Sequence, residues 1–242
     1  MKNSQQIAGG RVDAAHATSL PTMILPLAIG FMILFTSTLA FFVMSMSYET
    51  EKRTFHHITM FVTGIAAIAY LIMAFEGGAA ELTLTDGKVR TFFWVRYVDW
   101  ALTTPLLLLD IGLLANAPLA HIAYVIGCDV LMIVGGLVGP LLFAANDPAK
   151  WLLFYIGCFW FLPILYAMMV EWKTTLTDKA RPVYNVIANG TVVLWCAYPV
   201  MWAMCEGTGM LSDETEVILY LVLDMVAKSG LGFILLSSHD AI

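Results

Sequence analysis

The chain has 242 residues, of which 60% are hydrophobic and 12% are charged, and its formal net charge at pH 7 is −6. A soluble globular protein has about 45–50% apolar and about 25% charged residues, so this composition excludes an ordinary soluble domain and indicates a membrane protein. Because so little of such a chain faces water, the net charge indicates no particular partner.

Seven apolar stretches are each close to the length of about 20 residues that a helix needs to cross a hydrocarbon core of about 30 Å. In chain order they cover residues 20–46, 54–75, 92–114, 120–144, 151–170, 183–204 and 215–237. The connections are short and leave no room for a soluble catalytic domain. We therefore expect an all-α membrane protein in which residues 1–242 form one seven-helix bundle, with membrane lipid around it and no nucleic acid partner.

Two segments outside the predicted spans allow structural predictions of their own. Residues 1–19 are polar and lack the apolar core of a signal peptide, so we expect an uncleaved extracellular tail. Between the second and third spans, the sequence ELTLTDGKVRT alternates around Asp86-Gly87. That pattern predicts a two-residue turn and a small two-stranded β-hairpin outside the membrane.

The positive charges of the tail and the connections bear on the orientation of the chain. One side has Lys52, Arg53, Lys173, Lys179 and Arg181, and the other has Lys2, Arg11, Lys88, Arg90 and Lys150. The two sets are equal in number, so the positive-inside rule does not decide between orientations. The connections alone favour a cytoplasmic side with Lys52 and Lys179, which places the N-terminus outside the cell and the C-terminus in the cytoplasm.

The four cysteines all lie in or at the ends of the apolar spans. They are Cys128, Cys158, Cys196 and Cys205. Because the sequence has no CxxC or Cys/His spacing, we interpret them as small packing residues and expect no metal site.

Six ionisable residues lie well inside the spans, where each opposes insertion by about 2.5–3.5 kcal/mol near the centre of the bilayer. They are Arg96, Asp99, Asp110, Asp129, Asp224 and Lys228. A helical repeat of about 100° per residue places Arg96, Asp99, Thr103 and Asp110 on one face of the third span. At 1.5 Å per residue, Asp99 and Asp110 are about 16 Å apart along the axis. A structural ion pair does not need that separation, whereas a stepwise path for a small ion does.

Asp224 and Lys228 stand four residues apart in the seventh span. On an exposed helix such a pair contributes a few tenths of a kcal/mol, but this pair lies in the middle of a span. A desolvated lysine loses its proton readily and is prepared to form a Schiff base with an aldehyde. The resulting buried cation needs carboxylates nearby, and the candidates are Asp99 and Asp224.

An aromatic stripe in the sixth span suggests what the aldehyde is attached to. Trp195, Tyr198 and Trp202 follow the spacing i, i+3, i+7, and Trp100 offers a further flat wall. A stripe of this kind alone is more often core packing than a binding site. Together with the buried lysine, it predicts a slot for an elongated conjugated ligand.

The stretches RYVDWALTTPLLLLD, TVVLWCAYP and LDMVAKSGLGFILL resemble the third, sixth and seventh helices of microbial (type 1) rhodopsins. The resemblance extends over all seven spans and is greatest to the bacteriorhodopsin-like outward light-driven proton pumps. It implies that all-trans retinal is bound covalently to Lys228 as a protonated Schiff base and is isomerised by light to the 13-cis form. It also implies an ion transporter rather than an enzyme.

The resemblance further implies roles for the charged residues of the third and seventh spans. Asp99, Thr103 and Asp110 stand at the positions that distinguish members of the family, and Asp-Thr-Asp is typical of outward proton pumps. Asp99 would accept the Schiff-base proton, and Asp224 would be the second counterion. Asp110 would return a proton from the cytoplasmic side, since a carboxyl group with only apolar neighbours is expected to stay protonated.

Other positions of the chain match the family's exit path and binding pocket. Arg96 would order water below the counterions, Glu206 and Glu216 resemble the paired proton-release group, and Asp129 matches a buried carboxylic acid that joins helices. The pocket positions are Tyr70, Trp100, Thr104, Leu107, Met132, Gly136, Phe154, Trp195, Tyr198, Pro199 and Trp202. We find no matched role for His56, His57 and His121, which lie near helix ends, and interpret them as interfacial residues.

Two other functions stay open at this point. One is a sensory photoreceptor that signals to a transducer helix, against which Asp110 argues. The other is a retinal-free heptahelical receptor or carrier, in which Lys228 would be a charge in a substrate site. For the pump we expect protons and lipid as partners, the plasma membrane as location, and a homo-oligomer with a trimer as one option.

Overall fold

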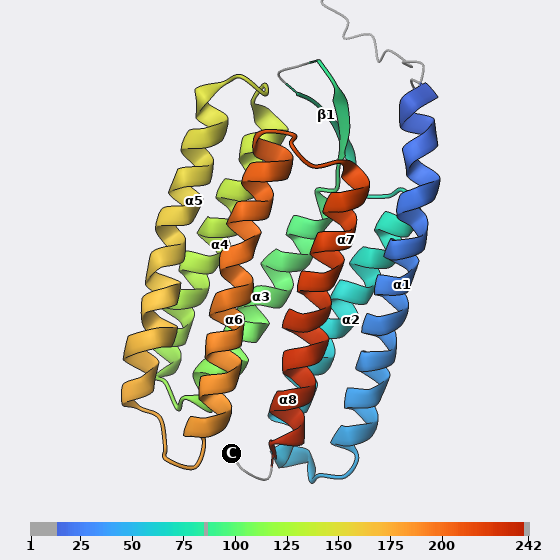
Figure 1. Cartoon of the computed structure of the whole chain (residues 1–242). Helices are drawn as coiled ribbons and strands as arrows, with labels where there is room; N and C mark the ends of the chain where they lie inside the picture. The colour runs from blue at the N-terminus through green and yellow to red at the C-terminus, as the bar shows by residue number, and fades with distance from the viewer. Residues whose placement is uncertain (1–13, 85–86, 240–242) are drawn as a thin grey trace, which may run out of the picture.

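The computed structural model describes residues 14–84 and 87–239. In this part of the chain, seven helices are long and apolar enough to cross a membrane. The first six of these spans contain α1 (Ala14–Ser45), α2 (Thr54–Ala74), α3 (Val95–Leu114), α4 (Leu119–Leu142), α5 (Pro148–Tyr166) and α6 (Arg181–Trp202), and the seventh contains both α7 (Asp213–Asp224) and α8 (Leu231–Ser237). The spans lie side by side with a hairpin at one end of the bundle and the C-terminus at the other (Figure 1). The predicted seven-helix fold is confirmed.

Three of the spans contain a π-helical turn. Turns at Ala167–Glu171 and Ala203–Gly207 extend α5 and α6, and a turn at Met225–Gly230 joins α7 to α8 within one span. In a π-helical turn the backbone hydrogen bonds join residues five apart instead of four. Such turns occur frequently at functional sites. The turn in the last span contains Lys228, the lysine that the sequence singles out.

The observed helices begin at other residues than the predicted spans in several places, including α5, which begins at Pro148 rather than at residue 151. Helix α1 begins at Ala14, so the predicted tail of residues 1–19 is helical in its last part, while residues 1–13 lie outside the described residues. The alanines at positions 14, 15 and 17 explain this, because alanine has the highest helix propensity. Helix α3 begins at Val95 rather than near residue 92, because Phe92 belongs to a strand.

The predicted hairpin is confirmed. Strand β1 (Ala80–Thr83) pairs antiparallel with β2 (Val89–Phe92). In the turn, Asp86 lies outside the described residues, and Gly87 has φ +82°, a conformation that glycine adopts without steric cost. The last three residues of β2 are buried, so the hairpin packs onto the end of the bundle instead of standing free as a flap.

The bundle is apolar on its outside and charged on its inside. Large apolar side chains such as Leu102, Leu152 and Val193 are exposed, whereas all six ionisable residues singled out within the spans are at most 2% exposed. This distribution is the reverse of that in a water-soluble protein and fits helices that contact lipid. The chain is therefore an integral multi-pass membrane protein.

Candidate functional site

The ammonium group of Lys228 lies between two carboxylates. Its Nζ is 2.5 Å from Oδ2 of Asp99 on α3 and 3.4 Å from Oδ1 of Asp224 on α7. Asp224 in turn accepts hydrogen bonds from the hydroxyl groups of Tyr70 and Tyr198, at 2.8 and 2.9 Å. The predicted juxtaposition of the lysine with both carboxylates is present, and the two carboxylates differ in their other partners.

The predicted polar face of α3 is buried along its whole length. Arg96, Asp99, Thr103 and Asp110 are each at most 2% exposed. The hydroxyl group of Thr103 donates to the backbone carbonyl of Asp99 at 2.8 Å, which satisfies it within the helix. The helical periodicity therefore identified the inward face of α3 correctly.

An apolar cavity extends from Lys228 between α3, α4, α5, α6 and α7. The predicted pocket residues that line it are Trp100, Thr104, Leu107, Met132, Gly136, Phe154, Trp195, Tyr198, Pro199 and Trp202. Tyr70 is the exception, because it contacts Asp224 and does not line the cavity. The sequence did not identify Ile133, Gly157, Cys158 and Phe161, which also line it.

The walls of the cavity are flat and aromatic. The ring of Phe154 stacks on Trp202 with centroids 4.3 Å apart and an interplanar angle of 10°. Trp202 also donates to the carbonyl of Gly136 at 3.0 Å, and a Cβ at that glycine would lie 3.3 Å from the ring of Tyr97. A single amine among the aromatic and apolar residues that line the cavity fits an aldehyde on a conjugated hydrocarbon, and two carboxylates are in place to balance the cation that would form.

Asp110 lies at the far end of α3 from the hairpin. Its Oδ2 accepts a hydrogen bond of 3.0 Å from the hydroxyl group of Thr59 on α2, and its Oδ1 has no hydrogen-bond partner among the described residues. The prediction that Asp110 has only apolar neighbours is wrong in this respect. Thr59 is 51 residues away on another helix, so spacing along the sequence could not reveal the contact.

Asp129 connects two helices. Its Oδ2 accepts a hydrogen bond of 2.6 Å from the hydroxyl group of Thr104, which ties α3 to α4 at the edge of the cavity. The contact agrees with the role in joining helices that the resemblance implies.

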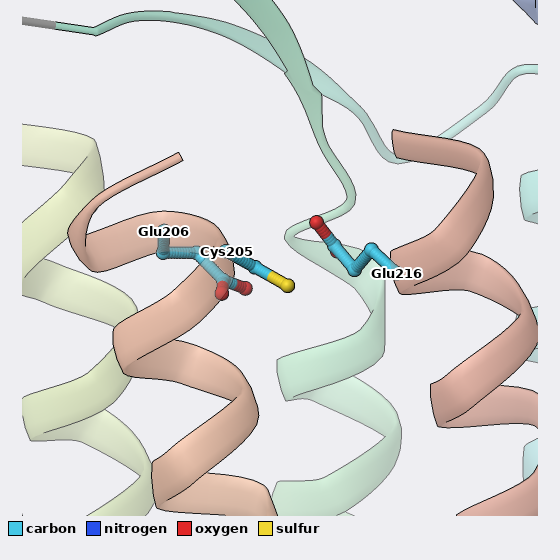
Figure 2. Close-up of side chains that lie close together, drawn as sticks. All are labelled: Cys205, Glu206 and Glu216. Atoms are coloured by element: carbon cyan, nitrogen blue, oxygen red, sulfur yellow. The ribbon is translucent and has the colours of Figure 1, made fainter. Parts of the chain in front are cut away.

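At the hairpin end, two buried glutamates lie close together. Glu206 and Cys205, from the π-helical turn after α6, point toward Glu216 at the start of α7 (Figure 2). The sulfur and one carboxylate oxygen of each glutamate lie within 4.8 Å of one another. Tyr97 donates to Oε1 of Glu206 at 3.1 Å, and Arg96 donates to Oε1 of Glu216 at 2.7 Å.

Two cations at this end were assigned wrongly from the sequence. Arg90 and Lys150 were counted as cations of the connections, but they are 3% and 2% exposed. Arg90 forms an ion pair with Glu216 and donates to the carbonyl of Cys205 at 2.5 Å. Burial opposes the charge on the Arg90 guanidinium, but the nearby acidic groups, Glu216 first among them and then Glu206 and Asp213, together outweigh it and the pKa of Arg90 is raised. Local sequence carries no signal for this burial, since it arises only when the hairpin packs on the bundle.

The two arginines also bear on metal binding. Arg90 and Arg96 engage both carboxylate oxygens of Glu216, so its charge is already compensated by two guanidinium groups. A metal ion bound by Cys205, Glu206 and Glu216 would have to compete with these cations. The cluster is therefore better suited to holding a proton than a metal.

The comparisons with known proteins agree with the geometry. The family described as Bacteriorhodopsin-like protein matches residues 21–242. Bacteriorhodopsin-II of Haloarcula marismortui is 40% identical over 193 residues, which cover 79% of this chain and 77% of that protein. The light-driven proton pump of Coccomyxa subellipsoidea has a TM-score of 0.85 and 32% identity, with 90% of this chain and 96% of that chain covered. Bromide-bound halorhodopsin from Halobacterium salinarum has a TM-score of 0.87 and 26% identity, with 94% and 97% covered. The resemblance seen in the third, sixth and seventh spans is thus confirmed, and the chain belongs to the bacteriorhodopsin-like family of microbial rhodopsins.

Proposed function

We propose that the protein is a light-driven outward proton pump that binds all-trans retinal at Lys228. The family comprises light-driven ion transporters, and the light-driven proton pump of Coccomyxa subellipsoidea is among its similar structures. The observation that carries the proposal is the pair of buried carboxylates on one face of α3. Asp99 touches Lys228, and Asp110 lies about 16 Å further along the axis. Asp99 can receive a proton from the lysine, and Asp110 can then supply the lysine with a new proton.

The cavity fits the cofactor. Lys228 would hold its aldehyde carbon, and Trp100, Trp195 and Trp202 would bound its conjugated chain. When bound, retinal supplies a change of shape on absorbing light that alters the surroundings of the lysine nitrogen. The side chain of Lys228 is buried and contacts Asp99, so a proton on its nitrogen exchanges first with the protein groups around it.

Asp99 is the proton acceptor in this proposal. In the dark, the proton is held at Nζ of Lys228, and Asp99 and Asp224 balance its charge. Oδ2 of Asp99 is within hydrogen-bond reach of Nζ and its Oδ1 has no partner among the described residues, so it can take up the proton. Both oxygens of Asp224 accept from tyrosine hydroxyl groups, which keeps it as a fixed counterion.

Asp110 is the proposed donor, and the hairpin end is the proposed exit. Asp110, whose polar partner is the hydroxyl group of Thr59, holds a proton in the dark and passes it to Nζ after Asp99 has been protonated. At the other end, Arg96 lies between the counterions and Glu216, and Glu206 is the second carboxylate of the exit.

The burial of two cations supports an outside location for the hairpin. Without Arg90 and Lys150, the count of positive residues in the tail and connections becomes five on the C-terminal side against Lys2, Arg11 and Lys88 on the hairpin side. More positive charge on one side favours that side as cytoplasmic. The plasma membrane as location and assembly into a homo-oligomer stay predictions.

The similarity to halorhodopsin makes a halide pump the competing function. Asp99 argues against it, because a carboxylate 2.5 Å from Nζ occupies the place that an anion would take. Illumination of cells that carry the protein distinguishes the two. We expect the medium to acidify, a protonophore to abolish the acidification, and replacement of chloride by sulfate to leave it unchanged. Light-driven alkalinisation that a protonophore enhances would indicate halide uptake, and no pH change would favour a sensory photoreceptor.

A further inference from the structure

A buried histidine lies near the end of the bundle that holds Asp110 and the C-terminus. His56, in the first turn of α2, is 0% exposed, and neither of its ring nitrogens has a hydrogen-bond partner among the described residues. Its ring centroid is 4.9 Å from that of Tyr48 and 5.0 Å from that of His239. A buried imidazole without partners is costly, so its presence calls for an explanation. His56 lies near a helix end, as expected, but its side chain is inside the protein rather than on its surface.

His56 stands in line with the proposed proton donor. It precedes Thr59 by three residues on α2, and residues three apart lie on the same face of a helix. Thr59 is the residue that donates to Asp110. His239, which follows α8 close to the C-terminus, contacts His56 and is only partly buried. From the end of the bundle inward, the order is therefore His239, His56, Thr59 and Asp110.

The charged and titratable residues near His56 come from the start of α2, from the connection between α1 and α2, and from the segment after α8. They are Arg53 and His57 at the start of α2, Tyr48 in the connection between α1 and α2, and His239 after α8. The ion pairs among the described residues include none between His56 and a carboxylate. A proton that arrives on the imidazole is therefore not trapped in a salt bridge.

We propose that His56, together with His239, relays protons from water to Asp110; this inference rests on the proposed function. After Asp110 has given up its proton, the unprotonated ring nitrogen of neutral His56 takes a proton from protonated His239, the opposite ring nitrogen releases its own proton, and the Asp110 carboxylate gains one through the hydroxyl group of Thr59 or a water molecule. His239 recovers its proton from water, and a flip of the neutral His56 ring restores its starting orientation. An imidazole can do this because it has a nitrogen on each side of the ring, so that one can accept a proton while the other donates one.

The variant His56→Phe in the complete, retinal-loaded protein tests the relay. His57→Phe is the matched control, since His57 is the adjacent histidine and is exposed. After a flash, a pH-sensitive dye outside oriented vesicles reports proton uptake, and absorption changes report the earlier steps. We expect His56→Phe to leave the transfer to Asp99 unchanged and to slow uptake about a hundredfold, the low end of the contribution of a positioned proton donor.

A merely structural role would not produce the pH profile that we expect. In His56→Phe, uptake should follow the proton concentration of the medium and be restored by added imidazole, and His239→Gln should show the same change to a smaller extent. Uptake in His56→Phe with the rate and pH profile of wild type and His57→Phe would overturn the relay. If His56→Phe does not fold, unchanged uptake in His239→Gln would overturn it. Absence of light-driven uptake in the wild type would instead refute the proposed function.

Discussion

Replacing Arg90 with glutamine tests whether the hairpin fixes the buried carboxylate of Glu216. Arg90 pairs with Oε2 of Glu216, donates to the carbonyl of Cys205 at 2.5 Å and lies 3.5 Å from Asp213. Removing one partner of a buried ion pair lowers the free energy of unfolding by about 3–5 kcal/mol. Because Arg96 remains 2.7 Å from the other oxygen of Glu216, we expect Arg90→Gln to cost about 3 kcal/mol, the lower end of that range.

A double-mutant cycle separates this ion pair from other effects of the substitution. Glu216→Gln removes the charge that Arg90 compensates, so Arg90→Gln should cost less in that background, with a coupling energy of about 2–3 kcal/mol. Unfolding in detergent micelles, followed by circular dichroism, supplies the four free energies. Lys179→Gln, at an exposed lysine of the connection between α5 and α6, is the control and should change stability by less than about 0.5 kcal/mol. Equal costs of Arg90→Gln in both backgrounds would refute the reasoning.

Three further predictions concern the spans. Lys228→Ala should remain colourless with added all-trans retinal, and a pigment bound through a Schiff base in that variant would contradict the assignment. Asp99→Asn should shift the visible absorption further to the red than Asp224→Asn, because Asp99 is 2.5 Å and Asp224 3.4 Å from Nζ; equal shifts would contradict this order. In Asp110→Asn, flash spectroscopy should show normal transfer to Asp99 but recovery of the lysine proton slowed by about 10²–10⁴-fold and restored by azide. Recovery at the wild-type rate would exclude Asp110 as donor.

The charges within the spans could be found from the sequence because each stands out against an apolar background. Asp99 and Lys228 are visible in this way, and the period of the helix correctly places Asp99 and Asp110 on the same buried face. The resemblance then supplied the pocket, whose residues come from five helices and could not be brought together by spacing alone.

Contacts between elements were not predictable from the sequence. Arg90 lies in a polar segment and Lys150 follows a short connection, so both have the local pattern of solvent-exposed cations. Their burial depends on how the hairpin and the start of α5 pack on neighbouring helices. The same holds for Thr59 beside Asp110 and for His56, whose place in the sequence gave no indication of its contact with His239.

The central claim is that the proton of Lys228 moves to Asp99. Time-resolved infrared spectroscopy tests it most directly, because a protonated carboxyl group has a C=O stretching band that a carboxylate lacks. The account predicts that a new carboxylic acid band arises at the same rate as the visible signature of Nζ deprotonation and is missing in Asp99→Asn. Loss of the Nζ proton without that band, or with a band that persists in Asp99→Asn, would contradict the account.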